Sequence, residues 1–402
     1  MKIIHSADWH WTEQRLDKCN VSASFVIDRS SSIRPFAHII AGDYWDKRQV
    51  LSSSSAVLPA IEALKSLASI SPVVMILGNN AHDAAGSLEI FRDLRTKFPV
   101  YVSERPASVA LCMNERSEFH FEPCVLPDGS VNSIKSAKVI FHLLPYPTKS
   151  FLLADASTSS VEESNLLITE ALKKIFLGFA AIGSEFSCPK ILIAHCNVTG
   201  ALVSSGQTLI GQDVAVSKFD LELASADYYA LGHIHVNQAI TPSMWYSGSI
   251  YHNNFGETER KYFNIVTFNP SKVKVEKVEI PSTPLSLHDV RLDSQTLELL
   301  DDIKTEDWED AELRIRVHLT AEQATLIDDE RIRERFPGAQ SYHIERITIP
   351  EERLRSESIV EARTLKDKLK EWAFVLEKEL PIEVFDMADE VESRINANRL
   401  EG

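Results

Sequence analysis

Short apolar runs that end in polar, chemically reactive side chains recur along the first 280 residues, and this repetition most constrains the fold. Each run has about four to six residues, the usual length of a strand, and is polar only at its C-terminal end. The clearest runs are KIIHSAD at 2–8, HIIAGD at 38–43, VVMILGN at 73–79, ILIAHCN at 191–197 and YYALGHIH at 228–235. The pattern predicts buried strands that deliver side chains to one edge of a sheet.

Helical patterns lie between these runs, for example at 55–69 and 161–182. Alternating strands and helices predict an α/β fold, a layered sandwich whose site is built from loops at the strand ends. We therefore expect one domain over 1–280.

The rest of the chain carries no comparable reactive cluster. Alternating segments such as ELRIRVHL and SYHIERITI predict a small α+β accessory domain over 281–349, and 350–402 is a strongly helical tail. Each tail helix has an apolar stripe at helical spacing: Leu365, Leu369, Trp372 and Leu376, then Val384, Ala388, Val391 and Ile395. Such helices can pack on their own domain or on the helices of a partner, and both interpretations stay open.

Charge and cysteine content limit the partners and the compartment. The 402 residues contain 42 Lys and Arg against 58 Asp and Glu, and a net charge of −16 argues against a broad basic surface for nucleic acid. The odd number of cysteines and the lack of a CxxC pair predict reduced, structural thiols in the cytoplasm. They are Cys19, Cys112, Cys124, Cys188 and Cys196. Neither a signal peptide nor a membrane span is expected.

Two pairs of residues have a spacing that suits a shared ligand. Asp8 and His10 are two residues apart, so an extended chain would place both on one face, and His233 and His235 have the same spacing. Each pair alone is a weak signal, since an Asp-x-His can also cap a strand and a His-x-His arises by chance.

Other polar residues follow the remaining runs. Asp43 and Asn79 or Asn80 come after glycines, where turn formation is the commoner role, and a single histidine such as His195 is often a core residue. The mixture of imidazoles, carboxylates and an amide nevertheless suits two Mn²⁺, Fe²⁺ or Zn²⁺ ions. Two such ions activate a water and clamp a phosphate oxygen, so the combination predicts phosphoester hydrolysis.

The sequence resembles the calcineurin-like metallophosphoesterases over roughly residues 1–255, and within them the SbcD-type DNA repair nucleases. The closer resemblance rests on SLEIF at 87–91, on the spacing from AHCNVTGA at 194–201 to LGHIH at 231–235, and on YSGSIYHNNFGE at 246–257. The accessory domain and the tail also occur where that family has a capping, DNA-binding domain and helices for a partner ATPase.

The resemblance implies a role for each site residue. One ion would be held by Asp8, His10 and His235, Asp43 would bridge, and the other ion would be held by Asn79, His195 and His233. His82 would stabilise the developing charge or protonate the leaving oxygen, with Asp83 orienting its ring. The family usually reads Gly-Asn-His-Asp, whereas two residues are inserted here before His82. Either Asn79 or Asn80 could therefore be the amide ligand, and impaired catalysis is a third possibility.

The resemblance further implies a nuclease subunit with exonuclease and structure-specific endonuclease activity in recombination or repair. It would use Mn²⁺, with Mg²⁺, Fe²⁺ or Zn²⁺ as alternatives, and would form a homodimer within a heterotetramer with an SbcC-type ABC ATPase bound through 350–402. Lys47 and Arg48 could contact a DNA phosphate, although a solvated turn is the slightly favoured explanation. The alternatives are a phosphomonoesterase with the same metal core and a non-catalytic scaffold subunit.

Overall fold

The computed structural model describes residues 1–47, 53–153, 161–204, 214–269, 272–291, 308–320, 323–326, 328–349, 362–376 and 378–400. The chain divides into two compact units. Unit 1 comprises Met1–His288, Ile303–Ile315 and Arg333–Ile344, and unit 2 comprises Asp289–Asp302, Arg316–Ile332 and Glu345–Gly402.

A six-stranded sheet with the order β15-β14-β1-β2-β3-β4 forms one half of the sandwich in unit 1. Its strands are β1 (Lys2–Ser6), β2 (Ala37–Ile40), β3 (Val73–Ile76), β4 (Val100–Ser103), β14 (Lys261–Asn269) and β15 (Lys272–Ile280). Strands β1 to β4 are parallel to one another, so their carboxyl ends lie at the same edge. Strand β14 is antiparallel to β1 and to β15.

A seven-stranded sheet with the order β12-β13-β11-β8-β7-β5-β6 forms the other half. Its strands are β5 (Ala107–Met113), β6 (Phe119–Pro123), β7 (Ala137–Leu144), β8 (Lys190–His195), β11 (Tyr228–Gly232), β12 (Gln238–Thr241) and β13 (Met244–Tyr246). Strands β7, β8, β11 and β13 are parallel. A separate pair joins β9 (Asn197–Val198) to β10 (Ala215–Val216).

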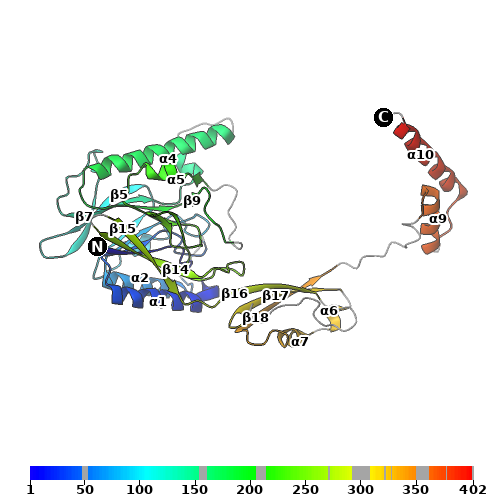
Figure 1. The fold of residues 1–402 in the computed structure, drawn as a ribbon, viewed down its shortest axis with the longest axis horizontal. Coiled ribbons are helices and arrows are strands. Elements are labelled where there is room, and N and C mark those ends of the chain that lie inside the picture. Colours follow the sequence, from blue (N-terminus) through cyan, green and yellow to red (C-terminus); the bar gives the residue numbers. More distant parts are fainter. Residues whose placement is uncertain are drawn as a thin grey trace. The chain divides into compact units, whose positions relative to one another are not determined.

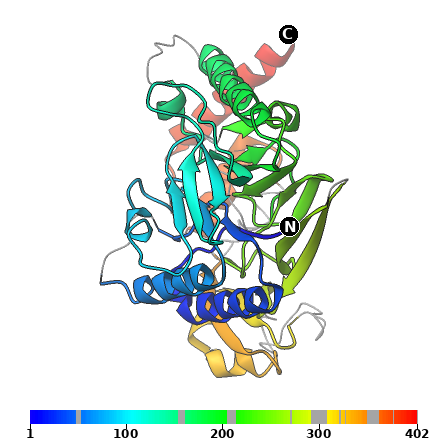
Figure 2. The same cartoon turned by 90° about the vertical axis from the view of Figure 1, so that its left-hand side faces the viewer.

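Side-chain alternation along the strands builds the layers, because neighbouring residues point to opposite faces. Ile3 of β1 lies in the core between the two sheets, together with Ile193 of β8, whereas Ile4 faces the helices outside the six-stranded sheet. Helices α1 (Leu16–Ile33) and α2 (Val57–Ile70) cover that outer face. Helices α4 (Val161–Ser184) and α5 (Lys218–Glu222) cover the outer face of the seven-stranded sheet (Figures 1 and 2).

This arrangement confirms the predicted α/β sandwich of two sheets flanked by helices. The five apolar runs singled out in the sequence are β1, β2, β3, β8 and β11. The connections also contain η1 (Glu13–Arg15), η2 (Glu89–Phe91) and α3 (Lys149–Leu152).

After Pro281 the chain forms a three-stranded sheet with the order β16-β17-β18. It consists of β16 (Leu285–Arg291), β17 (Glu312–Leu319) and β18 (Ser341–Thr348), and the short helices are α6 (Gln323–Leu326) and α7 (Asp329–Arg333). The domain boundaries at 280 and 349 stay predictions.

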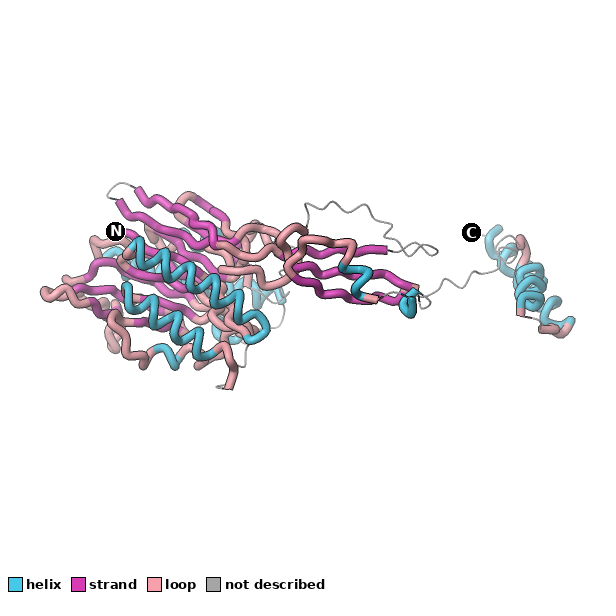
Figure 3. Tube along the Cα trace, turned by 90° about the horizontal axis from the view of Figure 1, so that it is seen from below, coloured by secondary structure: helices cyan, strands magenta, loops and turns pink. Residues whose placement is uncertain are grey.

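The tail contains α9 (Leu365–Val375) and α10 (Ile382–Leu400), which Figure 3 shows as two helical coils. The helices contact each other, and an ion pair joins Lys366 to Asp389. Ala373 and Ala388 are buried, whereas Phe374 is 82% exposed. The side chain of Ile395, from the second predicted stripe, lies outside the described residues. Within the described parts of the chain, no helix is both long and apolar enough to cross a membrane.

Candidate metal centre

The carboxyl ends of five parallel strands bring the predicted site residues together. The six-stranded sheet supplies residues that follow β1, β2 and β3, and the seven-stranded sheet supplies residues at the ends of β8 and β11. In chain order they are Asp8, His10, Asp43, Asn79, His195, His233 and His235. The centre is therefore built by both halves of the sandwich.

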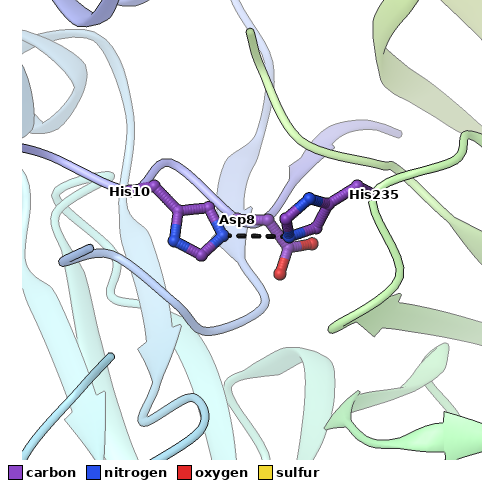
Figure 4. Close-up of side chains that lie close together, drawn as sticks. All are labelled: Asp8, His10 and His235. Atoms are coloured by element: carbon purple, nitrogen blue, oxygen red, sulfur yellow. Dashed lines mark hydrogen bonds between the residues drawn. The ribbon is translucent and has the colours of Figure 1, made fainter. Parts of the chain in front are cut away.

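Asp8, His10 and His235 form a first group of buried ligand atoms, all within 4.8 Å of one another (Figure 4). The Nε2 atoms of His10 and His235 are 3.1 Å apart. Two imidazole nitrogens can approach so closely only when a proton or a cation lies between them. The Asp8 carboxylate also accepts the backbone N–H of His233 at 3.0 Å, which ties the loop after β1 to the loop after β11.

A buried carboxylate orients His235. Oε1 of Glu257 lies 2.7 Å from His235 Nδ1, so this nitrogen carries the proton and Nε2 is left to face the group. Burial lowers the pKa of His235, but the hydrogen bond to Glu257 outweighs it and the net pKa is raised. Glu257 also accepts from Lys261 Nζ at 2.6 Å, and both side chains are fully buried.

Glu257 ends the motif YSGSIYHNNFGE at 246–257, but neither it nor Lys261 was predicted to have a role in the site. Their spacing of four residues is the only sequence signal for the ion pair, and nothing in it indicates that the pair contacts a histidine 22 residues away.

Asp43, His195 and His233 form a second group, again with ligand atoms within 4.8 Å. His195 Nδ1 donates to the carbonyl of Ala41 at 2.7 Å, and its Nε2 lies 3.2 Å from Asp43 Oδ2. Burial lowers the pKa of His195, but attraction to Asp43 outweighs it and raises the pKa to about 9. Burial likewise disfavours ionised Asp43, but attraction to His195 outweighs it and holds the pKa far below the usual range.

Several of these residues have a left-handed backbone conformation, which sets the direction of their side chains. The φ angles are 52° at Asp8, 47° at His10, 49° at Asp43 and 98° at His233. The expectation that Asp8 and His10 share a face of an extended segment is therefore wrong, because the chain leaves the strand after Ser6 and turns. The same turning separates His233 from His235, so that each histidine belongs to a different group.

Glycine allows the two sheets to approach closely at the centre. A Cβ atom on Gly42, whose φ is +88°, would lie 2.3 Å from His195 Nδ1, and one on Gly232 would lie 2.0 Å from the carbonyl oxygen of Ala41. Real Cβ atoms do not make such contacts, so glycine is required at both positions for His195 to reach Asp43.

The inserted residues before His82 form a turn, because the backbone N–H groups of His82 and Asp83 both donate to the carbonyl of Asn79 at 2.8 Å. Asn79 is buried, and its backbone N–H donates to Asp43 Oδ1 at 2.6 Å. Asn80 is exposed. The contact with Asp43 is made by the backbone of Asn79, whose side-chain Oδ1 accepts the backbone N–H of Ala81 at 2.9 Å, so the choice between the two side-chain amides stays a prediction.

His82 lies edge-on against His10, with ring centroids 4.6 Å apart. Its Nδ1 donates to the carbonyl of Asp46 at 2.7 Å. His10, Asp46 and His82 form a third set of possible ligand atoms within 4.8 Å, and the sequence analysis did not select Asp46.

The expectation that Asp83 orients His82 is wrong. The Asp83 carboxylate accepts three backbone N–H groups, those of Gly78, Tyr44 and Trp45, at 2.9 to 3.2 Å. Burial and the charge of Asp43 raise the pKa of Asp83 to about 7. Its structural role is to join the loops after β2 and β3.

The two expected DNA contacts are not placed by the structure. Lys47 is exposed, and Arg48 lies outside the described residues.

The donors of the two groups fit divalent metal ions. Each group offers two imidazole nitrogens and a carboxylate, all buried, and the nitrogens of His10 and His235 that face each other are hydrogen-bonded at 3.1 Å, close enough to share one cation in place of that proton. This nitrogen and oxygen set suits Mn²⁺, Fe²⁺ or Zn²⁺.

Comparison with known proteins finds one family and a distant structural likeness. Residues 1–237 match the family model for calcineurin-like phosphoesterase. Among solved structures, the chain is similar to GAP50, described as the anchor in the inner membrane complex of Plasmodium. The TM-score is 0.42 at 10% sequence identity, over 87% of this chain and 98% of that chain. That likeness is too remote to inform the fold or the function.

Proposed function

Because the chain belongs to the calcineurin-like phosphoesterase family, whose members are metal-dependent hydrolases of phosphoester bonds, we propose that it is a two-metal DNA nuclease subunit. The observation that carries this proposal is the pair of buried donor groups that meet where the two sheets approach. The first group, Asp8, His10 and His235, would hold one ion, and His195 and His233 would hold the other. Asp43 would be shared between the two groups, and Asn79 would supply an amide oxygen.

Two divalent ions, Mn²⁺ in the first place, would supply the positive charge that binds a phosphate oxygen and lowers the pKa of the attacking water. The protein holds the donor atoms in place: Ala41 orients His195, Glu257 orients His235, and Asn79 fixes Asp43. Because these contacts exist before the substrate binds, little reorganisation is needed at the moment of reaction.

His82 handles the proton in this proposal. Its Nδ1–H donates to the carbonyl of Asp46, so a second proton, carried on Nε2 in the imidazolium form, would be the one given to the oxygen leaving the phosphorus. The contact with His10 keeps the ring beside the first donor group.

DNA as substrate and an ATPase as partner rest on the resemblance of SLEIF, AHCNVTGA and YSGSIYHNNFGE to the SbcD-type nucleases. The tail supports a partner, since α9 and α10 expose large apolar side chains that include Trp372, Phe374, Ile382 and Met387. We propose that these side chains dock on an SbcC-type ABC ATPase, in a heterotetramer that contains a homodimer of this chain. With a net charge of −16, DNA capture would depend on that partner and on the ions. A cytoplasmic location is part of the same proposal, in keeping with five free cysteines.

The test is Mn²⁺-dependent degradation of labelled linear DNA, with and without the cognate ATPase. We expect Asp43→Asn to abolish cleavage and His82→Ala to slow it by about 10²–10⁴-fold, the usual contribution of general acid–base catalysis. Asn79→Ala should impair cleavage, whereas its neighbour Asn80→Ala should not. Hydrolysis of a phosphomonoester without DNA cleavage would favour a phosphomonoesterase, and no hydrolysis of either substrate would favour a scaffold.

Partner binding is tested separately by co-purification with the ATPase. Phe374→Asp should abolish binding and leave the metal content unchanged. Val21→Asp, at an exposed apolar residue of α1, is the control. Equal binding by both variants would contradict the docking proposal.

A further inference from the structure

A second cluster of metal-binding side chains lies on the outer face of the seven-stranded sheet, at its edge strand β6. Phe119 and Phe121 of β6 pack into the core between the sheets, so His120 and Glu122 point to the opposite face. Cys112 of β5 is paired directly with His120 across the antiparallel ladder. The cluster thus combines a thiol from β5 with an imidazole and a carboxylate from β6.

The three donor atoms are already close. The Cys112 sulfur, a His120 nitrogen and a Glu122 oxygen all lie within 4.8 Å of one another, and His120 Nε2 is 2.7 Å from Glu122 Oε1. Cys112 is fully buried, whereas the side chains of His120 and Glu122 are 42% and 35% exposed. An ion could therefore enter from solvent and reach a buried thiol.

The chemistry of these donors favours zinc. A thiolate, an imidazole and a carboxylate are the three side-chain types that bind Zn²⁺, and a three-residue set leaves the fourth tetrahedral position to water. Metal–ligand bonds of about 2.0–2.3 Å would place the donor atoms about 3.3–3.8 Å apart. Since these atoms lie within 4.8 Å of one another, movements of about 1 Å by the side chains would bring them to that spacing. Burial, and to a smaller extent Glu122, raises the pKa of Cys112. A bound cation would reverse this effect by stabilising the thiolate beside the carboxylate.

We propose that Cys112, His120 and Glu122 form a zinc site that fastens the β5–β6 hairpin at the edge of the sheet. It is separate from the phosphoesterase centre, because none of its residues lies at the strand ends that form that centre. The cysteine is thereby a metal ligand, in addition to the structural role expected from the sequence.

Cobalt substitution distinguishes this site from the phosphoesterase centre. Co²⁺ added to the metal-depleted, full-length protein should produce a near-ultraviolet thiolate-to-cobalt charge-transfer band, which the nitrogen and oxygen donors of the centre cannot produce. The band should disappear on titration with Zn²⁺. It should be lost in Cys112→Ser, weakened in His120→Ala, and retained in Cys196→Ser, which changes a fully buried cysteine elsewhere in the fold.

Asp43→Asn should retain the band, since that substitution damages only the phosphoesterase centre. Absence of the band in the wild-type protein would overturn the proposal. So would a band that survives Cys112→Ser, for example through Cys124, or one that His120→Ala leaves unchanged. Cys112→Ser could lose the band simply by misfolding, since Cys112 is buried. His120→Ala is an independent test of the site, because His120 is partly exposed and its substitution should leave the fold intact.

Discussion

Replacing Glu257 by glutamine tests whether the centre depends on a residue that contacts no substrate. The substitution keeps the shape of the side chain and removes its charge. In the wild-type protein this carboxylate accepts from His235 at 2.7 Å and from Lys261 at 2.6 Å, without exposure to solvent. The glutamine could still accept from His235 Nδ1, but without the assistance of a charge.

The expected size of the effect follows from that loss. A hydrogen bond to a charged group contributes about 1.5–3 kcal/mol, against about 0.5–1.5 kcal/mol for a neutral one. The difference between the midpoints is about 1.3 kcal/mol, which is roughly tenfold in an equilibrium constant. We therefore expect the Mn²⁺ affinity of the group that contains His235 to fall by about tenfold, at the lower end of the range known for residues that orient metal ligands.

The assay is the dependence of phosphodiester hydrolysis on Mn²⁺ concentration, together with metal content after dialysis. In Glu257→Gln the half-saturating Mn²⁺ concentration should rise about tenfold, and activity should recover in excess Mn²⁺. Glu259→Gln is the matched control, since Glu259 pairs with the same Lys261 at 2.8 Å, whereas Glu257 is the carboxylate hydrogen-bonded to His235 Nδ1. The reasoning is refuted if both variants show the same Mn²⁺ dependence.

Three further predictions concern the backbone at Gly42, the buried His38 and the binding of Mn²⁺. Gly42→Ala should abolish hydrolysis, because its Cβ would collide with His195, whereas Gly200→Ala has nearly the same φ of +87° and open space. The control should therefore lose only about 1–2 kcal/mol of stability and keep its activity, and equal activity of the two variants would contradict the argument. Burial lowers the pKa of His38 from 6.5 to about 3. Between pH 7 and pH 5 this histidine therefore binds a proton in the unfolded chain but not in the folded protein. This histidine should make the free energy of unfolding about 2 kcal/mol lower at pH 5 than at pH 7. In urea titrations, the difference in unfolding free energy between these two pH values should be about 2 kcal/mol smaller for His38→Gln than for the wild-type protein. Mn²⁺ at about 100 times its dissociation constant should raise the free energy of unfolding by about 2.7 kcal/mol, and a thermal shift of the same size in Asp43→Asn would exclude this residue as a ligand.

The strands, and the polar side chains that meet at their carboxyl ends, could be predicted because they depend on local patterns. A run such as YYALG is apolar throughout, as a strand buried on both faces must be, and it ends in residues with chemical roles. The family match over 1–237 and the sandwich agree with that interpretation.

The direction of the side chains could not be predicted, because it depends on backbone angles and long-range contacts. Nothing in Asp8-Trp9-His10 indicates left-handed φ angles, and nothing near Asp83 indicates that its carboxylate binds the backbone of Tyr44 and Trp45. Nothing near Asn79 indicates that its backbone N–H donates to Asp43, a residue 36 positions earlier.

Because both sheets supply the centre, its assembly has a time scale set by protein synthesis. Asp8 contacts the backbone of His233, which is 225 residues later in the chain. At about 5–20 residues per second, a ribosome needs roughly 10–45 s to make that stretch. Asp8 and His10 therefore lack their contacts with His233 and His235 until the second sheet has been synthesised and has packed against the first. Divalent ions would therefore act as late cross-links between two separately synthesised parts of the chain, and an ion bound to the early part alone would have donors only from Asp8, His10, Asp43, Asp46, Asn79 and His82.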